Sequence, residues 1–316
     1  MVDFRYHLVS IIAVFLALAV GIVVGTTALK GPVLDDLRDN IKRLSSDKRT
    51  LEGDVGNLRG QVRAADDFAA GVGPGLVRGA LADQRVLLVT TPETPSDVVD
   101  RLTVLLGQAG AGVTGRLRLL PQLSEPDQSQ LVDDLVAQVI PAGVDLPDGE
   151  PVEQATAELA AALVRPSSGA GVEVAEAQAV VSAFEEADLV QFESDGAPLQ
   201  QASLAVVLSG PAPNVNLEDA QTAQQEALLS LAAAVDRRAR GVVVAEPATS
   251  AADRGLVSRL RADSSLAAEV SSVDNADRGV GLVAMVLALA EQGRGAAGQY
   301  GAGPRSTGPL PSPAVP

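Results

Sequence analysis

Residues 8–29 form a stretch of 22 residues without a charged side chain, and its only polar side chains are those of Ser10, Thr26 and Thr27. A bilayer core about 30 Å thick is crossed by roughly 20 apolar residues in a helix. The stretch therefore predicts a transmembrane helix that follows a short N-terminal end, residues 1–7. A cleaved signal peptide usually has a shorter apolar region that ends in a small-residue cleavage site, so the sequence favours an uncleaved anchor.

Small side chains recur at every fourth position within this stretch. They are Ala13, Ala17, Gly21 and Gly25. Residues four apart share one face of a helix, and small residues on that face let two membrane helices approach closely. The stripe predicts packing of the span against a second membrane helix, with the general abundance of glycine and alanine in membrane helices as the alternative explanation.

A repeat of apolar residues at alternating intervals of three and four begins shortly after the span. Its a positions are Leu34, Ile41, Lys48, Val55 and Val62, and its d positions are Leu37, Leu44, Leu51, Leu58 and Ala65. Aliphatic or β-branched residues at a with leucine at d favour a parallel two-stranded coiled coil, and a lysine in the seam trades stability for register. Residues 33–66 therefore predict a coiled-coil stalk that pairs with a second chain.

The residues beside this seam give the coiled coil mixed support. Asp54 at a g position can meet Arg59 at the following e position of a partner, whereas Asp47 opposes Glu52. The glycines within residues 53–60 each cost up to about 1 kcal/mol relative to alanine inside a helix. The alternative is an amphipathic helix folded back on its own domain, which usually needs a wider apolar face than an a/d stripe.

The charged residues of the chain bear on its binding partners and on its orientation in the membrane. A net charge of -16 opposes binding to nucleic-acid phosphates, and the absence of cysteine excludes disulfides and thiolate ligands. Arg5 is the only basic residue before the span, and the basic residues after it include Lys30, Arg38 and Lys42. Basic residues mark the cytoplasmic side, so the charge count alone would place the C-terminal part in the cytoplasm.

Beyond the stalk, the pattern changes to alternating strands and helices. Residues 67–84, with a glycine-rich run at 71–79, predict a flexible linker. Strands are predicted at residues 85–91, 113–120, 204–210, 241–246 and 269–273, and helices at 96–108, 127–139, 152–164, 174–192, 217–238, 251–262 and 277–292.

Continuous valine and leucine runs separated by helices are typical of a parallel sheet covered on both faces. Residues 85–293 therefore predict an α/β domain, doubly wound and Rossmann-like or flavodoxin-like, with a mainly parallel sheet. Residues 294–316 are rich in glycine and proline and predict a disordered tail.

Ligands of such folds usually bind beyond the carboxyl ends of the strands. No glycine-rich phosphate motif follows any predicted strand, so neither a nucleotide nor another cofactor site is predicted. Asp97 and Asp253 begin two predicted helices, where a carboxylate far more often caps the helix than catalyses.

The residues needed for nucleophilic or metal chemistry are scarce. The single histidine is His7, at the membrane boundary. Without cysteine or a second histidine, the sequence offers no Ser–His or Cys–His pair and no His/Cys metal cluster. Glu185, Glu186 and Asp188 are expected on a solvated helix face. We predict no catalytic or metal-binding residues and no enzymatic activity.

Several segments carry a family resemblance. Residues 3–25, D-F-R-Y-H-L-V-S-I-I-A-V-F-L-A-L-A-V-G-I-V-V-G, resemble the opening of the actinobacterial MctB family, described as copper transport proteins and also known as SteB-like partners of a membrane cell-division protein. The resemblance continues in G-P-G-L-V-R-G-A-L at residues 73–81 and in D-R-G-V-G-L-V-A-M-V-L-A-L at residues 277–289.

This resemblance implies a single-pass cell-membrane protein with a cytoplasmic N-terminus and an extracytoplasmic domain, against the charge count. It also implies copper, but Cu(I) prefers thiolate and thioether ligands, and the only thioethers are those of Met1 and Met285. Met285 is expected to pack in a core.

We therefore expect a non-enzymatic envelope scaffold, with direct copper export or binding as the alternative. Its coil would be either a homodimer or a heteromer with a membrane-anchored cell-division protein. Neither nucleic acid nor nucleotide is an expected partner.

Overall fold

The computed structural model describes residues 4–28, 30–194, 196, 198–211, 218–248 and 255–311, without the side chains of residues 26–35 and of Glu218. The chain divides into two compact units, residues 1–64 and 65–316. The first unit contains helix α1 (Phe4–Ala28) and the larger part of helix α2 (Lys30–Val77). Over Phe4–Gly25, α1 is long and apolar enough to cross a membrane, and none of that stretch is buried by the rest of the chain.

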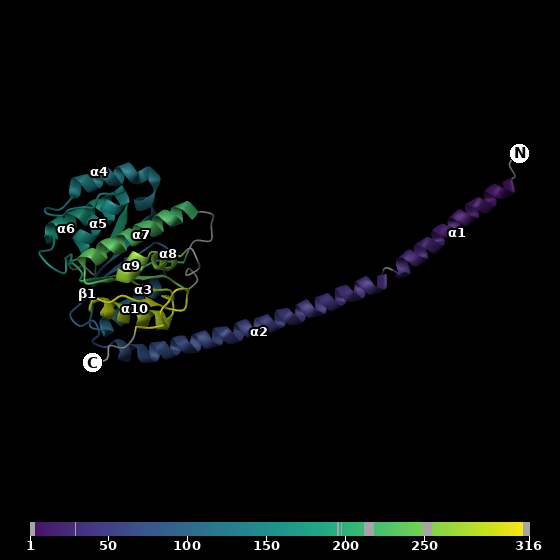
Figure 1. Ribbon diagram of the computed structural model, residues 1–316, viewed down its shortest axis with the longest axis horizontal. Coiled ribbons are helices and arrows are strands. Elements are labelled where there is room, and N and C mark those ends of the chain that lie inside the picture. The colour runs from purple at the N-terminus through teal and green to yellow at the C-terminus, as the bar shows by residue number, and fades with distance from the viewer. Residues whose placement is uncertain are drawn as a thin grey trace. The chain divides into compact units, whose positions relative to one another are not determined.

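The second unit is built on a seven-stranded sheet between two layers of helices (Figure 1). Its strands are β1 (Arg85–Thr90), β2 (Gly112–Leu119), β3 (Val190–Glu193), β4 (Leu204–Leu208), β5 (Val242–Ala245), β6 (Ser271–Val273) and β7 (Gln299–Tyr300). Their spatial order is β3-β2-β1-β4-β5-β6-β7, and every neighbouring pair is parallel except β2 with β3. The strand order reverses between β1 and β4, as in doubly wound folds. The predicted doubly wound α/β domain is confirmed.

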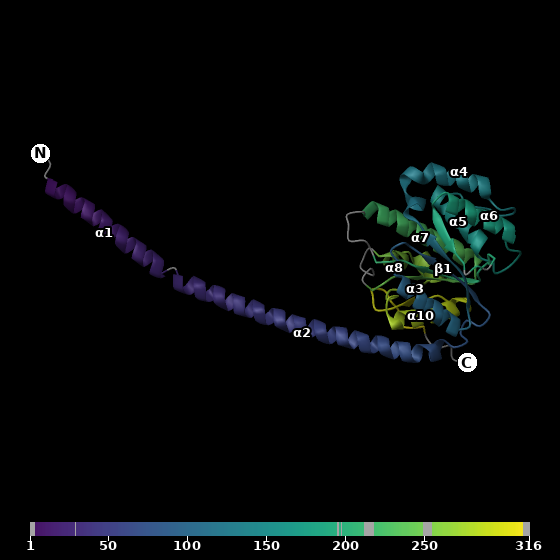
Figure 2. The ribbon, with the colours of Figure 1, turned by 180° about the vertical axis from the view of Figure 1, so that it is seen from behind.

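Helices cover both faces of this sheet (Figures 1 and 2). One layer contains α4 (Ser129–Val139), α5 (Pro151–Leu163), α6 (Val174–Glu186), α7 (Glu218–Arg238), α8 (Leu256–Ala262) and α9 (Ser264–Glu269). The other contains α3 (Ser96–Gln108), α10 (Gly279–Gln292) and the last turn of α2. Two short 3-10 turns, Pro121–Ser124 and Pro126–Gln128, precede α4.

The strands are apolar on both sides because each face of the sheet has its own buried cluster. Along β1, Val86 and Leu88 belong to the cluster with α3 and α10, and Leu87 and Val89 belong to the cluster with α5 and α7. Successive side chains of a strand point to opposite faces. Burial on both faces therefore accounts for the continuous apolar runs in the sequence.

The prediction of a flexible linker at residues 67–84 is wrong. Helix α2 continues to Val77 with Pro74 inside it. Glycine and proline disfavour a helix by propensity, but these turns pack on α10, and Val77 is fully buried. Tertiary packing therefore outweighs the local preference.

Two further predictions differ from the structure. The helix expected at residues 174–192 ends at Glu186, Asp188 adopts a φ of 54°, and the chain returns as the antiparallel edge strand β3. The tail expected to be disordered instead contributes β7 to the sheet. The starts of the helices predicted at 217–238 and 251–262 lie outside the described residues.

Candidate functional site

The predicted interface on α2 is an exposed apolar stripe along one helix. Leu44, Leu51 and Leu58 keep 71%, 63% and 59% of their surface exposed. Leu37, Ile41, Val55, Val62 and Ala65 are also exposed, and the side chain of Leu34 lies outside the described residues. A helix face of this kind can be buried by pairing with a second helix. The pairing itself stays a prediction.

The charged residues on α2 form exposed contacts within the helix. Lys48, in the middle of the predicted seam, lies 3.6 Å from Glu52, and Lys42 lies 3.2 Å from Asp39. Exposed ion pairs of this kind contribute about 0–1 kcal/mol. Lys48 therefore stands beside an acidic group that offsets its charge if the seam becomes buried.

The small-residue stripe of α1 is open in the same way. Ala13, Ala17, Gly21 and Gly25 are all exposed, and nothing lies within 4 Å of the positions that Cβ atoms on the two glycines would take. A second membrane helix could approach this face closely. That contact, too, stays a prediction.

The base of α2 is joined to the domain by a contact that the sequence interpretation missed. The Asp66 carboxylate accepts a hydrogen bond of 2.9 Å from the backbone N–H of Gly279 at the start of α10, and it lies 3.5 Å from the Arg278 guanidinium. A Cβ on Gly73 would lie 2.8 Å from a methyl group of Val283. The sequence did contain a signal for this contact, because Asp66, Gly73 and Val77 are spaced so that they share one face of a helix.

The carboxyl ends of β1 and β4, where doubly wound folds bind ligands, are closed by their own loops. The Thr94 hydroxyl donates to the Leu208 carbonyl at 2.9 Å, and the Gly210 N–H donates to the Thr91 hydroxyl at 3.3 Å. A Cβ on Gly210 would lie 2.2 Å from the Glu93 carbonyl carbon. The remaining cavity of about 30 Å³ holds little more than one water molecule.

Glu246 lines this small cavity and has a structural role. Its carboxylate accepts hydrogen bonds from the backbone N–H groups of Leu256 and Val257, at 2.9 and 3.1 Å. Burial raises the pKa of Glu246 to about 7, and these two hydrogen bonds act in the opposite direction. Glu246 therefore caps the start of α8. Asp253, predicted as a cap there, lies outside the described residues.

A buried ion pair organises the far edge of the sheet. Arg261 lies 2.7 Å from Asp274, and both side chains are 2% exposed. Arg261 also donates to the backbone carbonyl of Tyr300 at 2.7 Å, while Asp274 accepts from the N–H groups of Ala302 and Gly303, both at 2.8 Å. This network attaches the C-terminal segment to the sheet.

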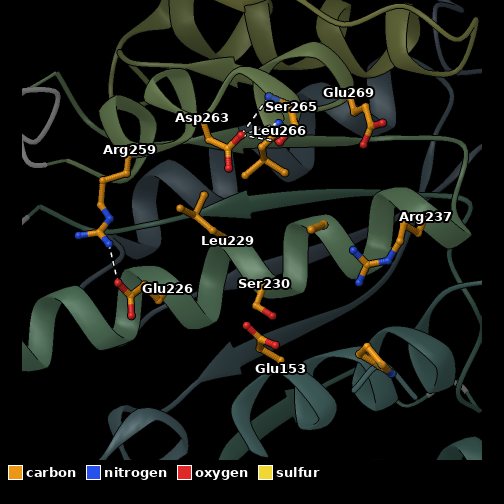
Figure 3. A pocket seen from close by; sticks show the side chains of 12 residues that line it. Glu153, Glu226, Leu229, Ser230, Arg237, Arg259, Asp263, Ser265, Leu266 and Glu269 are labelled. Atoms are coloured by element: carbon orange, nitrogen blue, oxygen red, sulfur yellow. Dashed lines mark hydrogen bonds and ion pairs between the residues drawn. The ribbon is translucent and has the colours of Figure 1, made fainter. Parts of the chain in front are cut away.

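A groove with a volume of about 670 Å³ runs between α7 and α8–α9 (Figure 3). Glu226 and Arg259 form a 2.6 Å ion pair at one end of it. Asp263 caps α9 by accepting the N–H groups of Ser265 and Leu266, and its pKa is lowered mainly by the hydrogen bond from the Ser265 hydroxyl. These three charged groups are engaged with one another or with backbone, and Glu153, Arg237 and Glu269 also line the groove.

The remaining candidates have ordinary structural surroundings. His7 is exposed on α1. Asp97 makes no capping hydrogen bond, contrary to the expectation, and lies in the first turn of α3, 3.3 Å from Arg101. Glu185 accepts the backbone N–H of Phe192 at 2.8 Å and so connects α6 to β3.

A comparison with known families decides the relationship that residues 3–25 suggested. The sequence profile of a family described as "Copper transport outer membrane protein, MctB" matches residues 1–311. The chain belongs to the MctB family. Relatives named "Copper transporter MctB" include those of Mycobacterium bovis and Mycobacterium tuberculosis, each 30% identical over 309 residues, 96% of this chain and 97% of the relative. The Mycobacterium leprae relative is 29% identical over 315 residues, 97% of this chain and 98% of the relative.

The MctB family description raises the question of copper ligands. Met285 is fully buried in the core beside α3, as expected. Within the described ranges, no group of three or more histidine, aspartate and glutamate side chains is arranged to hold a metal ion. Met1 lies outside those ranges.

Proposed function

We propose that this MctB family member is a non-enzymatic, single-pass envelope protein that acts as a coiled-coil scaffold. In this proposal α1 spans the membrane with its N-terminus in the cytoplasm, α2 pairs with a second helix, and the α/β domain is presented to envelope partners. A membrane-anchored cell-division protein is one such partner. The observation that carries the proposal is the exposure of Leu44, Leu51 and Leu58 on one face of α2.

Docking of a second helix is favoured because these leucine side chains are exposed to water in the single chain. Fully burying a leucine side chain contributes roughly 1.5–3 kcal/mol. Within the described part of the chain nothing covers the a/d face of residues 37–62, so this free energy becomes available only when another helix docks there. Two chains anchored in the same membrane can supply that helix in a parallel orientation.

We propose that the connection with copper is indirect and runs through assembly. Copper would be the cargo of the transport that the family description names, and Cu(I) is bound best by sulfur. With no cysteine in the chain and Met285 buried, an assembly role accounts for the residues better than direct ligation. The description also names an outer membrane, whereas a spanning α-helix is typical of inner membranes, and we propose the inner membrane.

Crosslinking in whole cells tests the scaffold. Leu44→Cys, in a chain that has no other cysteine, is labelled with a photoactivatable thiol reagent, and the captured protein is identified by mass. We expect a discrete adduct with a second copy or with one envelope protein. In the Leu44→Cys chain, replacing Leu51 and Leu58 by asparagine should abolish pairing, whereas asparagine at Arg43 and Thr50, on the outer face, should not.

Copper binding by the intact chain separates the alternative. The detergent-solubilised protein, dialysed against Cu(I), should retain less than one copper ion per chain. Tight stoichiometric retention would instead support direct copper handling and would count against the scaffold as the primary role.

A further inference from the structure

The apolar register of α2 continues beyond the predicted stalk and into the domain. Counting in sevens from Val62 places Ala69 and Leu76 at a positions, and counting from Ala65 places Val72 at d. All three lie in the helix, which ends at Val77. Val72 and Leu76 are 37% and 57% exposed. Ala69 is only 5% exposed and lies against α10 of its own domain. The a/d register therefore continues in phase to the last turn of α2, with one a position already covered.

The two flanks of this extension are unlike each other. Asp66 and Gly73 occupy e positions, and both face α10 of their own domain, through Gly279 and Val283 respectively. Phe68 occupies the opposite g flank and keeps 69% of its surface exposed. One flank is thus already covered, while the other presents an aromatic side chain to solvent.

We infer that a second copy of this chain pairs in parallel along α2 as far as Leu76, and that Phe68 of each copy packs against the α10 surface that covers Gly73 of the other. This inference rests on the proposed coiled coil and fixes both its partner and its extent. In a parallel pair, a g residue meets the e residue five positions later on the partner, which joins 68 with 73. Gly73 itself is buried beneath Val283, so the aromatic ring meets the surface of α10 next to it.

The same spacing explains why a second copy fits better than an unrelated helix. Asp54 at g and Arg59 at the following e attract one another across an identical partner, and this pair offsets the repulsion between Asp47 and Glu52 one heptad earlier. The contact of Phe68 with the partner's α10 is self-complementary in the same sense, because both halves come from one sequence. Each copy therefore supplies what the other lacks.

The surface of α10 next to the seam suits a second helix. Leu282 lies on the side of α10 that shares a groove with α3. Val280 and Leu287 lie about 150° around the helix from Leu282, at 100° per residue, and both are only half-buried. This places an apolar flank of α10 beside the a/d face of α2, where the partner helix and its Phe68 would rest.

The apolar area of the extended stripe is of the size that a dimer needs. Ten large side chains are 37–71% exposed along it, and they are Leu37, Ile41, Leu44, Leu51, Val55, Leu58, Val62, Phe68, Val72 and Leu76. With roughly 60–120 Å² for a whole aliphatic side chain, this is on the order of 500 Å² per chain. A standard interface buries about 800 Å² per partner, and Lys48, Ala65 and the flanking residues add to the sum.

Single-cysteine crosslinking tests the extent of pairing in the full-length chain in detergent. Leu58→Cys and Val72→Cys, both at d, and Asp67→Cys, on the outer f position, are treated with a short bis-maleimide. We expect Leu58→Cys and Val72→Cys to give a product of twice the chain mass and Asp67→Cys to give at least tenfold less. Crosslinking at 58 without crosslinking at 72 overturns the extension and leaves the scaffold intact. Failure at both positions overturns both.

Variants of Phe68 test its contact with the partner's α10. Phe68→Asp should raise the dissociation constant of the dimer at least tenfold, measured by sedimentation, whereas Phe68→Leu should change it less than threefold. Because Phe68 is largely exposed in the single chain, the melting temperature of the α/β domain should stay unchanged in both variants. An unaltered dimer in Phe68→Asp would overturn the contact.

Discussion

Glu158 is a fully buried carboxyl group in the middle of α5, and neither of its oxygens has a hydrogen-bond partner among the described residues. Burial raises the pKa of Glu158 from 4.5 to about 8. Between these two pH values the folded chain holds a proton that the unfolded chain has lost. The free energy of unfolding therefore falls as the pH rises through that range.

Glu158→Gln removes this titration and keeps the shape of the side chain. We expect the variant to melt several degrees above the unaltered protein at pH 8 and within about 2 °C of it at pH 5, since 1 kcal/mol corresponds to roughly 2–4 °C in a domain of this size. Thermal unfolding monitored by circular dichroism between pH 5 and 9 measures the difference. Glu153→Gln, an exposed position on the same helix, is the control and should leave the pH profile unchanged.

Arg261 and Arg259 allow a matched comparison of a buried and an exposed ion pair two residues apart. Arg261→Met leaves Asp274 buried without its cation, which typically costs about 3–5 kcal/mol. Arg259→Met breaks the pair with Glu226, whose side chain is 62% exposed, and should cost no more than about 1 kcal/mol. Chemical denaturation measures both, and equal losses would contradict the role assigned to the network.

The same comparison tests how the C-terminal segment is held. Arg261 binds the carbonyls of Tyr300 and Pro304, so Arg261→Met should also make residues 299–308 more sensitive to limited proteolysis. Arg259→Met should leave the cleavage pattern as it is.

At the scale of elements, the end of α2 can be tested with two glycines of one helix. Nothing lies within 4 Å of a Cβ on Gly71, whereas a Cβ on Gly73 would press against Val283. Gly71→Ala should stabilise the chain by up to about 1 kcal/mol through helix propensity. Gly73→Ala should lose that gain and lower the melting temperature. A higher melting temperature for Gly73→Ala would show that α2 does not pack closely on α10.

These elements also show what could be predicted from the sequence. The long strands and helices could be predicted because their apolar patterns extend over more residues than a single turn. The helix predicted at residues 174–192 included strand β3, because the four residues of this strand are too few to show an alternating pattern. Strand β7 could not be predicted from the local sequence. The composition of its segment favours disorder, and the segment is ordered by a long-range ion pair, Arg261 with Asp274.

The candidate site likewise contains one part that the sequence predicts and one part that it does not. The a/d positions from Leu37 to Val62 follow from spacing alone, and their exposure on a single helix agrees with that pattern. The attachment of α2 to α10 needed knowledge of a distant element, although Asp66, Ala69, Gly73 and Val77 repeat at intervals of three and four. Glycine at such an interval marked a close contact, where the sequence interpretation placed a flexible linker.

At the scale of the whole molecule, the proposed pairing along α2 depends on the phase of its apolar stripe. Deleting residues 48–54 removes one heptad, so that Asp47 at g is followed directly by Val55 at a. Deleting residues 48–52 removes five residues and turns the distal part of the helix by about 140°. The first deletion keeps the apolar stripe on one face, and the second splits it between two faces.

We expect the seven-residue deletion to retain crosslinking at both Leu44→Cys and Val72→Cys in the full-length protein. The five-residue deletion should retain crosslinking at Leu44→Cys and lose at least tenfold at Val72→Cys, because one partner helix is unable to follow both halves of the stripe. Both variants are shorter than the natural chain by a similar amount, so loss of length is controlled. Equal crosslinking at Val72→Cys in the two deletions would mean that the domains associate without α2, since only helical phase distinguishes the variants.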